Sequence, residues 1–322
     1  MSRPSDEVDI RLVSKVSSMY YHQDFNQQEI ADRLHLSRPK VSRLLKKARS
    51  QGIVQIKVVT PKQSFLEFET GLEEKFGLKE VVVIESNASE RETGGSILKQ
   101  QLGTAAADYL HRTVKEGDVL GVTWGTTLQA MVENMNPKPI KNLRIVQSLG
   151  GVGPPEAKAH AADISRRLSQ LLNGRLTLLP APGIVGSRDA RKVLMADRQV
   201  QHAFELISNI NTLFVGIGAL STNPVLSRER NEITDEMCRQ ISRSDAVGDI
   251  ALRFFNAEGE PIATDLNELM IGISLEKLKE IDTVVGIAGG PRKTEAIRGA
   301  LNGGYIDVLI TDHLTADQLL KE

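Results

Sequence analysis

Apolar residues recur at helical spacing in three successive segments near the start of the chain, residues 10–21, 27–34 and 38–49. Such spacing places them on one face of each predicted helix, so the three faces are expected to pack together in one small core. We expect this core to contain Leu12, Val13, Val16 and Met19 of the first segment, Ile30, Ala31 and Leu34 of the second, and Val41, Leu44 and Leu45 of the third.

The second and third segments together predict a helix-turn-helix. Ala31 stands where the two helices are expected to cross, because a larger side chain would hold them apart. Ser37 precedes Arg38 and Pro39, and a hydroxyl cap followed by a proline in the first turn is a common way to begin a helix.

The outward face of the third segment carries several cations and no acid. A helix with such a face suits the major groove of double-stranded DNA, which lies between two phosphate backbones. The alternative is a solvated basic helix on an ordinary helical bundle. Under the DNA-binding hypothesis the contacting residues are Gln27, Ser37, Arg38, Lys40, Ser42, Arg43, Lys46 and Lys47, with Arg49 on the same face.

The pattern changes after Gly52, which is expected to end the third helix. Residues 53–59 alternate apolar and polar side chains, as in a wing strand beside a DNA-binding unit. Thr60 and Pro61 break this strand, and helical spacing returns over residues 63–76 as a linker helix. Its apolar stripe needs a partner, either the next domain or the same helix of a second subunit; a dimer is favoured because DNA-binding helices usually work in symmetric pairs. The stripe consists of Phe65, Phe68, Leu72 and Phe76.

From residue 81 onward, short apolar runs alternate with amphipathic helical segments. The runs read VVVIE, VLGVTWG, RIVQSLGG, LTLLPAPG, TLFVGIGAL, TVVGIAGG and DVLITD, and most end in glycine or another small residue. Continuous apolar strands are typical of parallel sheets that are buried on both faces, and ligands bind at the carboxyl ends of such strands. We therefore predict an α/β protein with a winged helix-turn-helix domain at 1–60, a linker helix at 61–78 and a Rossmann-like effector domain at 79–322.

The loop after the second apolar run reads Thr123-Trp124-Gly125-Thr126-Thr127 and precedes a predicted helix. Hydroxyls and free N–H groups at a helix N-terminus bind anions, so Gly125, Thr126 and Thr127 are candidate phosphate ligands. The alternative is that Thr126 only caps the helix.

Other glycine-rich strand ends are expected at the same edge of the sheet and favour a ligand site there. They are Gly150 with Gly151, Gly216 with Gly218, and Gly289 with Gly290. Lys293 falls in the first turn of the helix after Gly290, where its ammonium can reach a phosphate held by the Thr126 loop; otherwise it is a surface lysine.

Two carboxylates lie in the segment DAVGD, ahead of a further predicted strand. Asp245 and Asp249 are suited to accepting hydrogen bonds from sugar hydroxyls. Either aspartate can instead cap a turn.

Charge distinguishes the two parts of the chain more clearly than the total does. The whole chain carries 40 Lys and Arg against 41 Asp and Glu, whereas residues 1–60 carry 11 against 6. Only this first part is therefore an electrostatic partner for DNA.

A length of 322 residues allows a second domain with a sizeable core, and 40% hydrophobic with 25% charged residues is an ordinary globular composition. The single cysteine, Cys238, excludes an intrachain disulfide, and no group of Cys and His has the spacing of a zinc site. The N-terminus lacks an apolar signal core, and no run of about 18 apolar residues is present. We expect a cytoplasmic protein with no metal, no cofactor and no membrane partner.

Five segments of the chain form an ordered set: EIADRLHLSRPKVSRLLKKAR, GVTWGTTL, VGIGAL, DAVGDIALRFFNAEG and VVGIAGGPRKTEAIRGALNGGYIDVLITD. Together and in this order they resemble the SorC family of bacterial sugar-responsive transcription regulators, and the resemblance covers nearly the whole chain. It implies an effector domain with the fold of sugar-phosphate isomerases and glucosamine-phosphate deaminases, assembly as a dimer or tetramer, and a DNA affinity that a phosphorylated sugar alters.

The resemblance also implies roles for individual residues. Gly125, Thr126 and Thr127 resemble phosphate-loop positions, Asp249 resembles the carboxylate that faces ligand hydroxyls, and Lys293 resembles the lysine of the C-terminal motif. The segment SLGGVGPPEAKAH departs from some relatives because it lacks an arginine beside the glycine pair, which argues against a ligand with a second phosphate.

We therefore interpret the chain as a regulator of a carbohydrate-related operon whose DNA affinity is modulated by a phosphorylated sugar or polyol. The alternative is an enzyme resembling sugar-phosphate isomerases or deaminases, with acid–base groups drawn from Asp245, Asp249, Lys293 and His160. No matched pair of titratable groups has a spacing that specifies proton transfer, so we predict no catalytic residue. A DNA-architectural or assembly protein with an empty pocket is a third hypothesis, but it leaves the Gly and Thr loops without a purpose.

Overall fold

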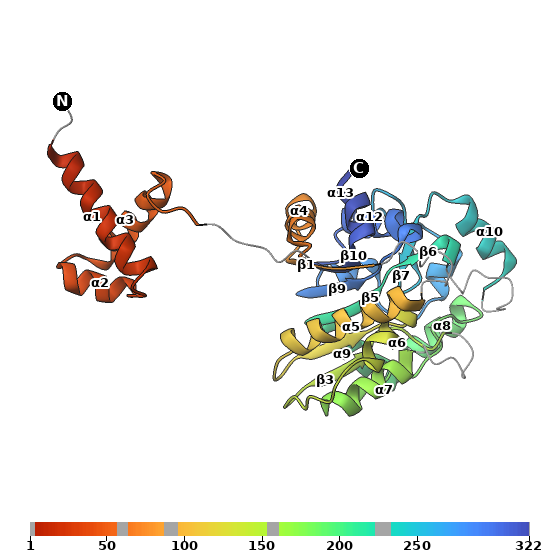
Figure 1. Cartoon of the computed structure of the whole chain (residues 1–322). Helices are drawn as coiled ribbons and strands as arrows, with labels where there is room; N and C mark the ends of the chain where they lie inside the picture. The colour runs from red at the N-terminus through yellow and green to blue at the C-terminus, as the bar shows by residue number, and fades with distance from the viewer. Residues whose placement is uncertain (1–3, 57–63, 87–95, 153–160, 223–232, 322) are drawn as a thin grey trace. The chain divides into compact units, whose positions relative to one another are not determined.

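The computed structural model describes residues 4–56, 64–86, 96–152, 161–222 and 233–321. The chain divides into two compact units, Met1–Gln63 and Ser64–Glu322 (Figure 1). Each unit has a hydrophobic core of its own.

The smaller unit contains three helices, α1 (Pro4–Tyr21), α2 (Gln27–Leu34) and α3 (Arg38–Ser50). The predicted core is confirmed, because one cluster joins the apolar faces of all three helices, with Leu12 and Leu34 partly buried at its margin. Ala31 is 1% exposed, as expected of a small residue where two helices cross. The buried members are Val13, Val16, Met19, Ile30, Ala31, Val41, Leu44, Leu45 and Ala48.

Local hydrogen bonds fix the beginning and end of α2. The Asn26 side chain accepts the N–H groups of Gln28 and Glu29, and the Glu29 carboxylate accepts the N–H of Asn26 in return, which makes a complete capping box. The helix ends at His35, which adopts a left-handed conformation with φ 51°. Ser37 occupies the N-cap position of α3, but its hydroxyl makes no capping bond, so the predicted hydroxyl cap is wrong.

The predicted wing strand is not seen where the structure can test it. Residues 53–56 follow α3 without forming a strand, and residues 57–59 lie outside the described residues. Within the described part of the smaller unit, the fold is helical throughout.

The larger unit is built on a parallel sheet of seven strands, as predicted. Each of the seven apolar runs contains one strand. The strands in the middle of the sheet are buried on both faces, as continuous apolar runs predict. In spatial order the strands are β1 (Glu80–Ile84), β10 (Val308–Asp312), β9 (Thr283–Ile287), β5 (Thr212–Gly216), β2 (Val119–Val122), β3 (Arg144–Gln147) and β4 (Arg175–Thr177).

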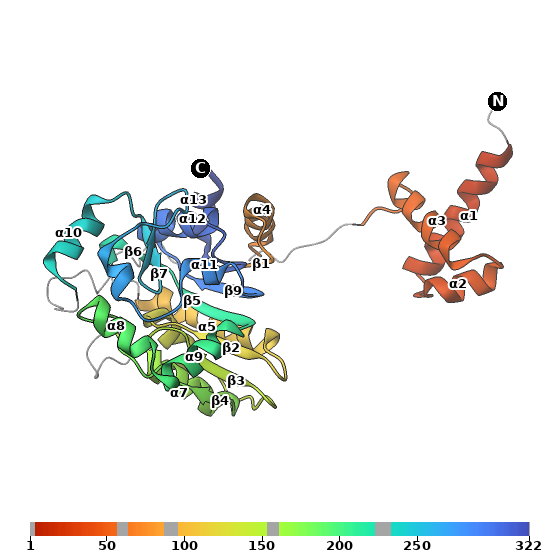
Figure 2. The ribbon, with the colours of Figure 1, turned by 180° about the vertical axis from the view of Figure 1, so that it is seen from behind.

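Helices cover both faces of this sheet and form a three-layer arrangement (Figures 1 and 2). One face packs against α5 (Ser96–Thr113), α6 (Thr126–Glu133) and α7 (Ala161–Leu172). The other face packs against α4 (Leu66–Phe76), α9 (Arg198–Ser208), α12 (Thr294–Asn302) and α13 (His313–Lys321). The connections also contain α8 (Arg188–Met195), α10 (Asp235–Arg243) and α11 (Leu275–Leu278). Among the described helices, none is both long and apolar enough to cross a bilayer.

A small antiparallel sheet of three strands was not predicted. It contains β6 (Gly218–Ala219), β7 (Gly248–Ile250) and β8 (Arg253–Phe255). Asp249 therefore lies inside a strand and not in the loop ahead of it. The turn between β7 and β8 places Ala251 and Leu252 at φ 52° and 62°, a conformation that usually requires glycine or asparagine.

The apolar stripe of α4 is covered by the larger unit of the same chain. Leu72 is fully buried, and Phe65, Phe68 and Phe76 pack partly buried against the same core. The helix lies against β1 and α13. Of the two partners considered for this stripe, the chain's own domain is therefore the correct one, and the stripe gives no argument for a second subunit.

Candidate functional site

The basic face of α3 points away from the core of the smaller unit. Ser37, Arg38, Lys40, Ser42, Arg43 and Lys46 are exposed, whereas Gln27 and Lys47 are partly buried. The first turn of α3 contains no acidic residue. Four of the six exposed residues are cations, so α3 presents a cationic surface to solvent.

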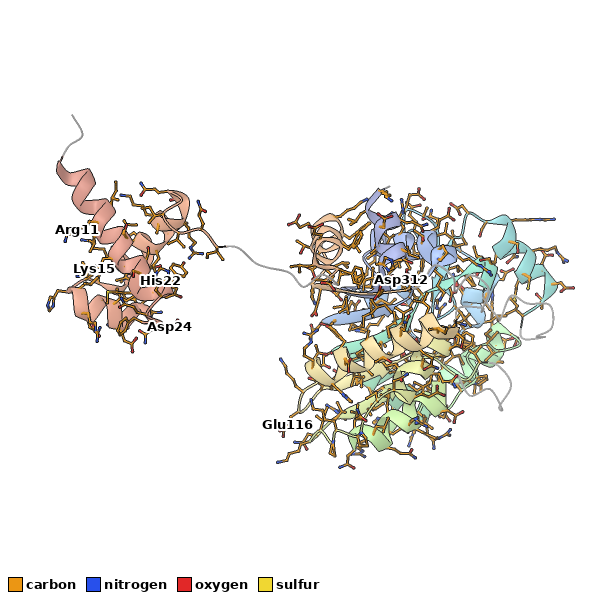
Figure 3. All side chains as sticks on the ribbon, in the orientation of Figure 1. Arg11, Lys15, His22, Asp24, Glu116 and Asp312 are labelled. Atoms are coloured by element: carbon orange, nitrogen blue, oxygen red, sulfur yellow. The ribbon has the colours of Figure 1, made fainter. Side chains whose placement is uncertain are left out.

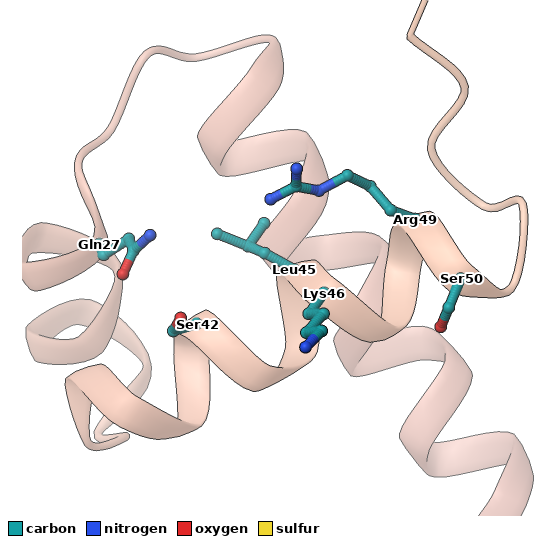
Figure 4. Close-up of a pocket in the computed structure, with 6 residues that line it drawn as sticks. All are labelled: Gln27, Ser42, Leu45, Lys46, Arg49 and Ser50. Carbon is teal, nitrogen blue, oxygen red and sulfur yellow. The ribbon is translucent and has the colours of Figure 1, made fainter. Parts of the chain in front are cut away.

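A shallow hollow lies between the start of α2 and this surface (Figure 4). The Arg49 side chain extends along α3 towards Gln27, which adds a cation from the last turn of the helix. A groove walled by amide, hydroxyl and cationic groups suits the phosphate backbone of DNA. The lining residues are Gln27, Ser42, Leu45, Lys46, Arg49 and Ser50.

In the larger unit, the path of the chain reverses between β2 and β5. It proceeds from β2 outward through β3 and β4, then returns to β5 beside β2 and continues in the other direction through β9 to β10. Parallel sheets bind ligands outside the carboxyl ends of the strands at such a switch point. The loops after β2 and β5 meet there, since the Trp124 carbonyl lies 3.8 Å from where a Cβ on Gly216 would stand.

The N-terminus of α6 lies at this switch point without a side-chain cap. Its N-cap residue is Gly125, at φ 129°, which offers no side chain to the first N–H groups of the helix. Thr126 is the first helical residue and exposed, so the alternative in which it is the cap is wrong. Thr127 is 7% exposed. The first N–H groups of α6 have no acceptor within the helix and are available to an anion.

Lys293 connects the loop after β9 to the loop after β5. It ends a single 3₁₀ turn after Gly290, and its Nζ donates a hydrogen bond of 2.7 Å to the Ile217 carbonyl. Burial lowers the pKa of the Lys293 ammonium; the nearby Asp249 carboxylate opposes this effect and the Lys99 ammonium adds to it. Lys293 is therefore a partly buried cation at the switch point and not a surface lysine.

Asp249 is buried beside these groups. Its Oδ2 accepts the N–H of Leu252 at 3.0 Å, and its carboxylate packs so closely against Gly218 that a Cβ there would collide with it. The antiparallel pairing of Gly218 with Asp249 places this carboxylate next to the residue that follows Ile217. Asp249 and Lys293 thus converge on the same short segment after β5.

Asp245 is placed differently. Its carboxylate accepts a hydrogen bond from Asn256 Nδ2 at 3.3 Å, at the open end of the β7–β8 hairpin. Asp249 is next to the turn at the other end of that hairpin. The structure therefore separates the two aspartates that the sequence interpretation grouped together.

Gly150 and Gly151 serve close backbone packing after β3. The Gly150 N–H donates to Ile271 and the Gly151 N–H donates to Ala181, each at 3.0 Å. A Cβ on Gly150 would lie 2.7 Å from the backbone of residues 181–183. Since both N–H groups are already bonded, these glycines shape the surroundings of the switch point and do not offer free donors.

Two polar residues at this edge were missed by the sequence interpretation. Lys99, in the first turn of α5, acts on the Lys293 ammonium through its charge. Asp312, which is labelled in Figure 3, is the last residue of β10 and 1% exposed. Its carboxylate accepts the Gly290 N–H at 2.7 Å. An aspartate directly between a buried strand and a helix was the available signal for Asp312; Lys99 had none.

Comparison with known proteins identifies both units. Residues 61–321 match the family model described as "Putative sugar-binding domain", and residues 15–51 match the model described as "Sigma-70, region 4". The chain is similar to the deoxyribonucleoside regulator of Bacillus subtilis (strain 168), at 33% identity over 312 residues, which cover 97% of this chain and 98% of that protein. It is also similar to the sorbitol operon regulator of Klebsiella pneumoniae, at 31% identity over 322 residues, covering 97% of this chain and 98% of that protein.

The crystal structure of the full-length sorbitol operon regulator SorC from Klebsiella pneumoniae has the same architecture. It matches this structure with a TM-score of 0.73 and 30% identity, covering 97% of this chain and 99% of that one. The helix-turn-helix and the matched sugar-binding domain define a DNA-binding transcription regulator with a sugar-binding effector domain. The chain belongs to the SorC family of sugar-responsive regulators.

Proposed function

We propose that a phosphorylated sugar or polyol binds at the carboxyl edge of the parallel sheet and changes the affinity of the helix-turn-helix for operator DNA. The observation that carries this proposal is the convergence of a partly buried lysine, a buried carboxylate and an uncapped helix N-terminus at the switch point. We call Gly125, Thr126, Thr127, Asp249 and Lys293 the effector site.

Each group of the effector site has a distinct part in this proposal. The N–H groups at the start of α6 and the Thr127 hydroxyl hold the phosphate, and Lys293 contributes a charge from the loop after β9. Asp249 accepts hydrogen bonds from sugar hydroxyls, which selects for the polyhydroxylated part of the ligand. No cofactor takes part, because the ligand acts by binding alone.

Regulation and not catalysis is the proposed role of this site. The relatives named above are regulators. Of the acid–base candidates for an enzyme, Asp245 is bonded to Asn256 away from Lys293, and His160 lies outside the described residues. Asp249 and Lys293 remain close together, and both serve equally well as binding groups.

Titration calorimetry with a panel of phosphorylated sugars tests the effector site. Thr127→Val and Lys293→Ala are expected to weaken binding by about 1.5–3 kcal/mol each, because each removes a hydrogen bond to a charged group. The matched control is Lys115→Ala, which removes an exposed lysine from the loop before β2, at the opposite edge of the sheet.

DNA binding without ligand should be unchanged in these variants. If no phosphorylated sugar binds, or if both variants bind as tightly as wild type, the assignment is wrong. Turnover of a bound sugar phosphate that is lost on changing Asp249 or Lys293 would instead establish the enzyme alternative.

The proposed partners are operator DNA, the sugar effector and further copies of this chain. A symmetric dimer or tetramer presents paired recognition helices, so the operator should contain inverted half-sites. Sedimentation of the protein at micromolar concentration and footprinting of its operator test this together. A monomer that protects one undivided site would contradict it.

A further inference from the structure

The buried carboxylate of Asp312 ties the effector site to the start of α13. Its Oδ2 accepts the Gly290 N–H at 2.7 Å and the Thr315 hydroxyl at 2.6 Å, and its Oδ1 is 3.3 Å from the Ser86 hydroxyl. Gly290 lies three residues before Lys293. It costs much free energy to leave a buried carboxylate without its hydrogen-bond donors. The loop that carries Lys293 and the first turn of α13 are therefore expected to move together.

The next residue, His313, connects this point to the start of α4. Its Nδ1 accepts the Ser86 N–H at 3.1 Å, and its ring is stacked on Phe65, with centroids 5.2 Å apart and planes 16° apart. Phe65 is the second residue of the larger unit and directly precedes α4. One imidazole thus touches the loop after β1 and the place where the chain enters the effector domain.

The far end of α13 also contacts α4. Lys75 Nζ donates to the Leu319 carbonyl at 2.9 Å, and Gly71 leaves space for Leu320, which would lie 3.2 Å from a Cβ at that position. Contacts at both ends mean that a shift of α13 must be followed by α4 or must break these contacts. No such pair of contacts was foreseen from the sequence, because the two helices are about 240 residues apart.

We propose that His313 is a coupling residue, through which α13 transmits occupation of the effector site to Phe65 and α4. This inference rests on the proposed function. In this scheme, a phosphate at the effector site draws the Lys293 ammonium away from the Ile217 carbonyl, which displaces the loop that Asp312 holds. His313 contacts neither the effector site nor DNA in this scheme; it sets how strongly the two are linked.

Amide hydrogen exchange on the full-length protein, with inorganic phosphate as the probe, tests the coupling. In the wild-type protein, saturating phosphate should change the rates of amide hydrogen exchange of residues 66–76 several-fold. In His313→Ala and in Phe65→Ala, the phosphate dissociation constant should stay within about twofold of wild type, while the response of α4 becomes clearly smaller because only the contacts at the far end of α13 remain.

Phe76→Ala is the matched control, because it truncates the same residue type at the other end of α4, beside Lys75. This variant should pack α4 less tightly but keep the change in amide exchange on phosphate binding. It therefore distinguishes the specific effect of the His313–Phe65 contact from a general loosening of α4. A full α4 response in His313→Ala overturns the inference, as does a wild-type protein that binds phosphate without any change in α4. Failure of wild type to bind phosphate removes the phosphate site itself and the inference with it.

Discussion

Lys293 combines burial with two opposing charges. Burial lowers the pKa of its ammonium below the ordinary value of 10.5, the Asp249 carboxylate raises it, and the Lys99 ammonium lowers it again. Two cations near one carboxylate leave an excess of positive charge, which an anionic ligand would neutralise. The charge state of this single side chain should therefore control ligand affinity.

As pH rises, the affinity for a phosphorylated sugar is expected to decline at a lower pH than the one at which an ordinary lysine loses its proton. The anion prefers the ammonium form, so binding weakens as pH rises through the lowered pKa of Lys293. Removing the like charge in Lys99→Gln should move this decline to higher pH. Calorimetric titrations from neutral to alkaline pH measure both effects, and a flat profile up to the ordinary lysine range would contradict the placement of Lys293.

Gly218 is expected to be intolerant of substitution. A Cβ there would collide with the Asp249 carboxylate, so Gly218→Ala should cost about 1–3 kcal/mol of folding free energy through overpacking. Gly186→Ala is the control, since nothing lies within 4 Å of a Cβ at that position. Urea unfolding of the two variants gives the comparison, and equal stabilities would show that the carboxylate can move aside.

Residues were predictable where their role depends on near neighbours in sequence. Lys293 was found because it follows a glycine pair at a strand end. Asp245 and Gly150 could not be placed, because their surroundings come from Asn256 and from residues 181–183. Those contacts depend on how distant segments pack.

At the scale of elements, α3 carries the expected DNA contacts. If Arg43 reads a base, Arg43→Ala is expected to cost about 1–3 kcal/mol of DNA-binding free energy and to relax the preference for sequence. If Arg43 binds phosphate, the variant should weaken binding to all DNA sequences alike and lower the slope of log affinity against log salt concentration by about 1. Arg33→Ala removes the same charge from α2, where the guanidinium lies 4.2 Å from the centre of the Phe25 ring. Fluorescence anisotropy at several salt concentrations distinguishes these outcomes, and equal losses in the two variants would argue against α3 as the recognition helix.

Strands were predicted well where an apolar run contains them, even β4 with only three residues. After Asp245 and Asp249 a single strand was predicted where the structure has the hairpin of β7 and β8, and β6 was not distinguished from the apolar run that forms β5. The spacing of Phe65, Phe68 and Leu72 predicted α4 but could not name its partner. An apolar stripe on a helix indicates that the stripe packs against another part of the protein or a partner. Which surface it packs against depends on the tertiary structure.

The whole molecule should unfold in two steps, because its two units have separate cores. A phosphorylated sugar at 100 times its dissociation constant should stabilise the larger unit by about 2.7 kcal/mol and leave the transition of the smaller unit in place. Differential scanning calorimetry of the full chain with and without ligand measures this. A single transition that shifts as a whole would show that the two units unfold cooperatively.

The fold class was predictable for the whole molecule, but the order of the strands was not. Alternating strands and helices indicate a parallel α/β sheet, and no local pattern states that β1 pairs with β10 or that β5 lies between β9 and β2. The proposed effector site depends on that order, since the loops after β2, β5 and β9 come together only because these three strands are neighbours.

The pairing of β1 with β10 also has consequences for truncating mutations in the gene. Glu80 lies opposite Val308, so the first strand of the sheet has no neighbour until the more than 200 residues that separate the two strands have been translated. The helix-turn-helix is complete by residue 50. A premature stop codon or frameshift between codons 80 and 308 therefore leaves a finished DNA-binding head attached to a sensor whose outermost strand is unpaired. Late truncating mutations should consequently abolish the response to sugar and often lower the amount of folded protein. Missense mutations in the DNA-binding head should abolish only operator recognition.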